Sequence, residues 1–150
     1  MPNIDIQDIL LGKVNDYLSP DKARIVEEAY LVAYKAHKGQ KRLSGEPYIV
    51  HPVNTALLLA DLNLDATTLA AALLHDVVED TEVSTKEVES QFGKLVADAV
   101  AILTDESGKN RKERKSKTYA KMSTVSGETE IALVVKAADR LANIRACVAD

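Results

Sequence analysis

The chain has 150 residues, which fits one compact domain, and its 46% hydrophobic and 28% charged residues are an ordinary globular balance. A formal net charge of -4 argues against a surface built for nucleic acid, and a single cysteine, Cys147, excludes an internal disulfide framework. The N-terminus has acids where a secretory signal has bases, and no apolar run approaches the ~18 residues of a membrane span, so we expect a soluble cytoplasmic protein.

Helical signals begin at the N-terminus and continue through the first half of the chain. The first predicted helix covers about 4–18, and Ser19 then provides an N-cap for a second helix. The loop that follows, 38–50, is rich in turn formers and charge. Pro52 suits the first turn of a third helix, which places His51 at the N-cap.

The second half is also helical. Asp65 caps a fourth predicted helix that continues through 67–78, and Ser84 with Glu87 forms a capping box for a short fifth one. Further helices are predicted at 94–104, 111–122 and 128–148. No segment alternates with period two, and aromatic residues make up only 4%, which predicts a core of Ala, Leu and Val. We therefore predict an all-α fold, a bundle of about seven helices that occupies residues 1–150 as one domain.

The segment 69–80 carries the most informative residues. An apolar helix is followed within two turns by His75, Asp76, Glu79 and Asp80. Carboxylates this close repel one another, and at a helix C-terminus they also oppose the helix dipole. A bound cation compensates such an arrangement. The alternative is a helix end that enters solvent with hydrated acids.

Two distant residues favour the cation. His51 lies between an apolar segment and a helix-starting proline, so it is held rigidly, although a lone histidine there is more often structural. Asp139 interrupts the apolar stripe of the last helix, and an acid on a buried stripe is either paired or bound to metal. Its alternative partners are Arg140 and Lys136.

Two histidines and two aspartates form a mixed nitrogen and oxygen donor set. Such a set suits Mn²⁺, with Fe²⁺, Co²⁺ or Zn²⁺ as alternatives. A bound divalent ion would lower the pKa of its water and polarise a phosphoryl oxygen. The residues therefore favour metal-dependent phosphoryl chemistry.

Four segments together resemble a known family. They are GEPYIVHP at 45–52, AALLHDVVEDT at 71–81, FG at 92–93 and KAADRLANIR at 136–145. An HP pair, an HD pair and a distant aspartate form the pattern of the HD phosphohydrolase superfamily, and these segments resemble the hydrolase domain of RelA/SpoT proteins. LTDESGKNRKERK, at 103–115, is similar to stand-alone alarmone hydrolases. The resemblance covers about 29–145.

The resemblance implies an HD-type domain that removes the 3′-pyrophosphate of (p)ppGpp to give GDP or GTP and pyrophosphate. The positions that match metal ligands, usually of Mn²⁺, are His51, His75, Asp76 and Asp139. The positions that match the acidic pair handling the attacking water and its proton are Glu79 and Asp80. The positions that match nucleotide contacts are Arg42, Ser44 and Asn143. No nucleic-acid or membrane partner is implied, and an oligomer is left open.

Some positions depart from the family pattern, and they concern substrate recognition. Leu43 replaces a common second basic residue, Ala142 a common aromatic or histidine, and Ala146 a common Thr or Asp. Family members also usually continue through further helices beyond the position of Asp150. Two alternatives therefore stay open: the same chemistry on another nucleotide, such as NADPH or a nucleoside phosphate, and a non-catalytic alarmone-binding module.

Overall fold

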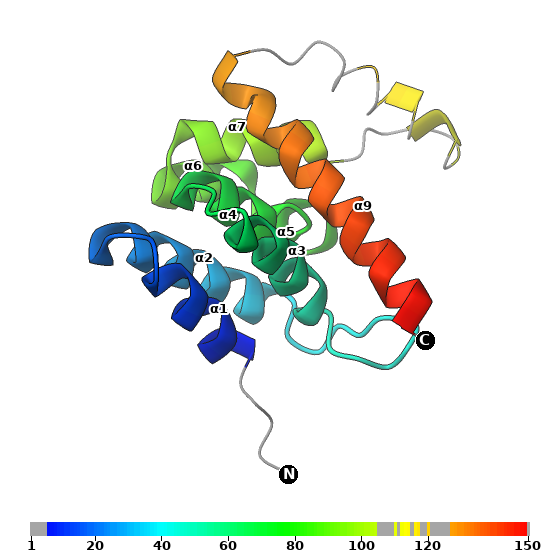
Figure 1. Ribbon diagram of the computed structural model, residues 1–150. Helices are drawn as coiled ribbons and strands as arrows, with labels where there is room; N and C mark the ends of the chain where they lie inside the picture. Colours follow the sequence, from blue (N-terminus) through cyan, green and yellow to red (C-terminus); the bar gives the residue numbers. More distant parts are fainter. Residues whose placement is uncertain are drawn as a thin grey trace.

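Helix α4 (Ala66–Leu74) lies at the centre of the computed structural model (Figure 1). Its sequence, ATTLAAALL, is apolar apart from two threonines in the first turn, and each residue from 68 to 74 is buried. Four helices contact it: α2 (Pro20–Ala36), α3 (Val50–Asp61), α7 (Lys94–Leu103) and α9 (Ile131–Ala149). A helix that is apolar all round is stable only inside a bundle, which explains this position.

Further elements of the bundle lie around this group. They are α1 (Ile6–Asn15), α5 (Val77–Asp80), α6 (Thr85–Phe92) and the 3₁₀ turn η1 (Gly127–Glu130). The structure describes residues 6–104, 110, 112–114, 116–117, 120 and 127–149, with the backbone alone at 80, 128–129 and 146–149. Half of the predicted helix at 111–122 lies outside these residues, and its described residues, 112–114, 116–117 and 120, are helical. Within the described part of the chain no strand is present, and no helix has both the length and the apolar character needed to cross a membrane. The prediction of an all-α fold is confirmed.

Three predicted N-caps are present. The side chains of Ser19, Asp65 and Ser84 accept hydrogen bonds from backbone N–H groups three residues further on, at 3.4, 3.0 and 3.2 Å. Each cap satisfies one of the amide groups that the first turn of a helix leaves without a partner. These caps fix where α2, α4 and α6 begin, so local sequence sets the N-terminal boundaries of these three helices.

The core has the predicted composition. Apart from Tyr30 and Ile49, every buried hydrophobic residue that the structure describes is Ala, Leu or Val. Phe92, the single phenylalanine, is only half-buried and packs against the edge of this core. Small side chains let helices approach closely, so the bundle fills its interior without large aromatic rings.

Helix α3 starts earlier than predicted. Its first residue is Val50 and its N-cap is Ile49, so His51 is the second residue of the helix and not the cap. Pro52 is the third residue. The first turn of a helix contains N–H groups that have no intrahelical partner, so proline fits there without delaying the start of the helix.

Candidate metal centre

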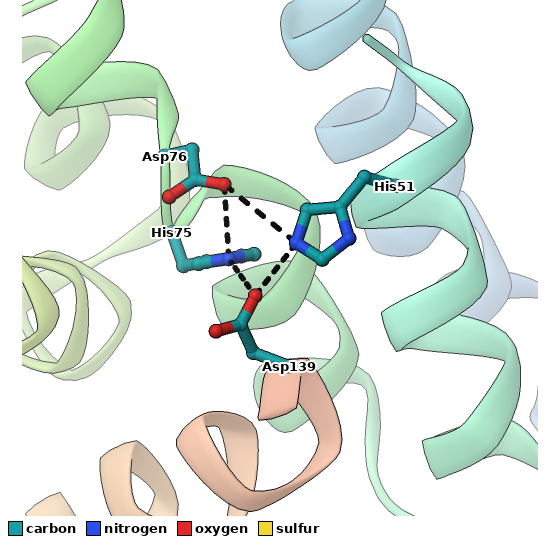
Figure 2. A group of neighbouring side chains, drawn as sticks. All are labelled: His51, His75, Asp76 and Asp139. Atoms are coloured by element: carbon teal, nitrogen blue, oxygen red, sulfur yellow. Dashed lines mark hydrogen bonds and ion pairs between the residues drawn. The ribbon is translucent and has the colours of Figure 1, made fainter. Parts of the chain in front are cut away.

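Four side chains from three separate parts of the bundle converge on one point (Figure 2). His51 comes from α3, Asp139 from α9, and His75 and Asp76 from the junction of α4 and α5. One possible ligand atom from each lies within 4.8 Å of the others. The structure therefore brings together all four of the predicted metal ligands.

The junction between α4 and α5 differs from the prediction of one continuous helix over 67–78. Helix α4 ends at Leu74, and α5 begins at Val77. Asp76 has φ -99° and ψ -6°, which departs from regular α-helix values and interrupts the helix. Adjacent residues of a regular helix point about 100° apart. The interruption allows His75 and Asp76 to face the same centre.

The donor atoms are close enough to surround a small cation. His51 Nε2 lies 2.6 Å from Asp139 Oδ1, and His75 Nε2 lies 3.1 Å from the same oxygen. Asp76 Oδ2 lies 3.1 Å from His75 Nε2 and 4.0 Å from His51 Nε2. Two imidazole nitrogens and two carboxylate oxygens thus face each other at the centre.

The orientation of His75 fits a metal ligand. Its Nδ1 lies 2.5 Å from the backbone carbonyl oxygen of Ala72, which can only accept a hydrogen bond. Nδ1 therefore donates its hydrogen to that carbonyl, and Nε2 is directed to the centre. Metal-binding histidines are commonly fixed by this kind of contact on the second ring nitrogen.

Charge at the centre is concentrated and buried. Burial alone would lower the pKa of His75, but the charge of Asp76 and the hydrogen bonds to both aspartates outweigh it and raise the pKa to about 10. Burial would raise the pKa of Asp76, yet the charge and hydrogen bond of His75, with a hydrogen bond from Tyr48, lower it to about 2. Burial would also raise the pKa of Asp139. Hydrogen bonds from His51 and His75 outweigh this effect and hold that pKa well below its usual range.

The carboxylates of the buried Asp139 and the half-buried Asp76 together favour positive charge at the centre. A proton on His75 supplies one positive charge in the protein without metal. A divalent cation supplies two, and it meets ligand types that suit Mn²⁺, Fe²⁺, Co²⁺ or Zn²⁺. The four residues therefore fit a divalent metal.

Lys136 is one of the two alternative partners expected for Asp139, and its ammonium group lies close to the Asp139 carboxylate. Its Nζ is 3.7 Å from Asp139 Oδ2, the carboxylate oxygen that does not contact the histidines. Arg140, the other alternative, is exposed. Lys136 thus neutralises part of the carboxylate charge and leaves Oδ1 facing the centre.

The predicted nucleotide contacts lie in a loop and on α9. Arg42, in the loop between α2 and α3, donates a hydrogen bond of 3.0 Å to Asn143 Oδ1 on α9. Figure 1 shows this loop in cyan beside the C-terminal end of α9. Ser44 is exposed and accepts a hydrogen bond from the backbone N–H of Glu46. Leu43, one of the departures from the family pattern, is fully exposed at the same loop.

The predicted proton-transfer pair lies on α5. Glu79 is exposed, and Asp80 is the last residue of the helix. The side chain of Asp80 lies outside the described residues. Because α5 begins directly after Asp76, both acids follow the candidate metal ligands His75 and Asp76 by about one helical turn.

Tyr48 is a residue of the site that the sequence did not reveal. Its hydroxyl donates a hydrogen bond of 2.6 Å to Asp76 Oδ2. Its ring contacts the rings of His51 and His37, with centroids 5.9 and 4.8 Å apart. The only local signal was its place three residues before His51. A contact with Asp76, 28 residues away, could not be predicted from that spacing.

This helical bundle with two histidines and two aspartates at its centre is the arrangement expected of an HD domain. The HD domain family matches residues 29–150, and the chain belongs to that family.

Similar proteins connect the chain with RelA/SpoT-type enzymes, so the resemblance is confirmed. The chain is 42% identical to the bifunctional (p)ppGpp synthase/hydrolase SpoT of Escherichia coli K12 over 135 residues. The match covers 88% of this chain and 19% of SpoT. It is 39% identical over 126 residues to the guanosine-3′,5′-bis(diphosphate) 3′-pyrophosphohydrolase of Aquifex aeolicus, which is 84% of this chain and 18% of that protein. The chain thus spans about a fifth of the length of these curated relatives.

A solved structure agrees with the sequence similarity. The structure of a metazoan ortholog of SpoT that hydrolyses ppGpp has a TM-score of 0.71 and is 33% identical. The match covers 86% of this chain and 71% of that one.

Proposed function

We propose that this chain hydrolyses the 3′-pyrophosphate of guanosine tetra- and pentaphosphate. The observation that carries the proposal is the convergence of His51, His75, Asp76 and Asp139 within 4.8 Å. It occurs in a chain about 40% identical to proteins named as (p)ppGpp hydrolases. The reaction consumes one water and gives GDP or GTP and pyrophosphate.

In this proposal the four converging residues hold one divalent ion, and Mn²⁺ is the ion we expect. When bound, the ion would activate a water and polarise a phosphoryl oxygen. The protein pre-organises the site, because it orients the ligand side chains in the absence of the ion. The Ala72 carbonyl orients His75, and the interruption of the helix turns Asp76 to the same side.

Glu79 and Asp80 are the acid–base pair of the proposal. Hydrolysis requires one proton to leave the attacking water and one to reach the ribose 3′-oxygen as its bond to phosphorus breaks. Two carboxyl groups one turn beyond the metal ligands are suited to these transfers. A module that only bound the nucleotide would need neither group.

Arg42, Ser44 and Asn143 are proposed to contact the nucleotide. Two observations support this part of the proposal: Arg42 and Asn143 are hydrogen-bonded to each other, and the Arg42 guanidinium lies 6.0 Å from the ring of Tyr48, whose hydroxyl contacts Asp76. The guanidinium group supplies positive charge for a substrate that carries several phosphates. Asn143 offers an amide that can both donate and accept hydrogen bonds.

The experiment that tests the substrate is product analysis on a nucleotide panel. Protein loaded with Mn²⁺ is incubated with ppGpp, pppGpp, NADPH and GTP, and the products are separated by ion-exchange chromatography. We expect pyrophosphate with GDP or GTP from the first two substrates only. Orthophosphate released only from NADPH or GTP, with no product from ppGpp or pppGpp, would mean that the substrate is another nucleotide. Binding of ppGpp without any product would make the chain a binding module.

A further inference from the structure

We propose that Tyr48 is a positioning residue that holds the Asp76 carboxylate in place for the metal ion. The inference rests on the metal site of the proposed function and not on its substrate. Tyr48 is half-buried at the end of the loop that precedes α3. It contacts two of the four candidate ligands, although it is not one of them.

The contact with Asp76 is made by the hydroxyl group. Tyr48 O–H donates to Asp76 Oδ2 at 2.6 Å, the short distance typical of a hydroxyl bound to a charged carboxylate. Oδ2 is the oxygen that faces the nitrogens of His75 and His51. A carboxylate oxygen has two lone pairs, so the hydroxyl can occupy one and fix the direction of the other toward the centre.

The contact with His51 is made by the backbone and the ring. The His51 backbone N–H donates to the Tyr48 carbonyl at 3.0 Å, and the two rings meet edge to face with centroids 5.9 Å apart. Tyr48 therefore links His51, at the start of α3, with Asp76, at the break after α4. These two ligands belong to different helices, and their relative position determines the size of the metal site.

The ring of Tyr48 is itself held in place. The Tyr48 backbone N–H donates to the Gln40 carbonyl at 2.9 Å, which ties the two ends of the loop together. The ring of the buried His37 packs on one part of it, and the Arg42 guanidinium lies 6.0 Å from its centroid. These contacts restrain the ring of Tyr48, so its hydroxyl is held in position to orient the Asp76 carboxylate.

A phenol suits this position better than a charged donor would. Lysine or arginine at the same place would neutralise Asp76 and weaken its attraction for a cation. The neutral hydroxyl orients the carboxylate and leaves its negative charge available to the metal. Outer partners of this kind typically change metal affinity by about 10–100-fold when they are removed.

The test compares two single-atom deletions. Tyr48→Phe removes the hydroxyl and keeps the ring. Tyr17→Phe is the matched control, because the Tyr17 hydroxyl donates a similarly short hydrogen bond, 2.7 Å, to the Leu64 carbonyl and contacts no candidate ligand. For each protein the dissociation constant of Mn²⁺ alone is measured by competition with a chromophoric chelator, after circular dichroism has shown that the helices are intact.

We expect Tyr48→Phe to raise the Mn²⁺ dissociation constant about 10–100-fold and Tyr17→Phe to leave it at the wild-type value. The rise in Tm that Mn²⁺ causes should shrink in Tyr48→Phe only. Excess Mn²⁺ should restore the turnover of Tyr48→Phe, because the hydroxyl is proposed to act through metal affinity and not on the chemical step. Wild-type affinity in Tyr48→Phe, or an equal loss in both variants, would overturn the inference. A wild-type protein that binds no Mn²⁺ would instead contradict the metal site of the proposed function, and this inference with it.

Discussion

Replacement of Asp139 by alanine removes the carboxylate that both histidines contact. Asp139 Oδ1 lies 2.6 and 3.1 Å from the two Nε2 atoms, so the variant loses one of the four candidate ligands and the carboxylate that contacts two others. Loss of an outer partner alone costs about 10–100-fold in metal affinity, and loss of a ligand should exceed that range. We expect no metal to remain on the variant after gel filtration.

The same substitution should destabilise the protein without metal. Removing one partner of a buried ion pair costs about 3–5 kcal/mol, and we expect the lower end because Asp76 still faces His75. At roughly 2–4 °C per kcal/mol for a protein of this size, the Tm in chelator should fall by about 6–12 °C.

Two measurements check these values. Protein loaded with Mn²⁺ is desalted and its metal content is determined by elemental analysis, and thermal unfolding is followed by circular dichroism in excess chelator. Asp98→Ala is the control, since Asp98 forms an exposed ion pair with Lys94 on α7 and should change neither result appreciably. Stoichiometric Mn²⁺ on the Asp139→Ala variant would refute the assignment of this ligand.

Three further predictions concern turnover, binding and stability. Glu79→Gln or Asp80→Asn should lower turnover about 10²–10⁴-fold with metal content retained, and unchanged turnover in both would remove their acid–base role. Asn143→Ala should raise the KM for ppGpp about tenfold at nearly constant kcat, because Asn143 is proposed to bind the ground state and the transition state equally well. An unchanged KM would place Asn143 outside the nucleotide site. Leu73→Ala, in the buried helix α4, should cost about 2–5 kcal/mol in chemical denaturation, and a change below 1 kcal/mol would contradict the central position of that helix.

Local features of the fold were predictable from the sequence. Ser19, Asp65 and Ser84 act within three residues of their own positions, so their cap signals can be recognised without knowledge of the rest of the chain. The Ala, Leu and Val core follows from composition in the same way. The start of α3 was missed by two residues, because proline is compatible with several positions of the first turn and does not define one of them.

The contacts of the candidate site could not be predicted from local sequence patterns. His51 and Asp139 are 88 residues apart, and each taken singly had a structural alternative. Only the combined motifs placed them together. The interruption at Asp76 was not predicted, because no glycine or proline between 66 and 80 marks a break in the helix. The hydrogen bond of Tyr48 was missed for a similar reason, since it depends on where two helices meet.

The most direct test of the account is a titration of activity with metal. Protein freed of metal by chelation receives Mn²⁺ in steps from zero to several equivalents, and the initial rate of pyrophosphate release from ppGpp is measured at each step. The account predicts no release without metal, a rise in rate up to one equivalent per chain, and a plateau beyond it. Full release of pyrophosphate from the metal-free protein, or no release at any Mn²⁺ concentration, would contradict it.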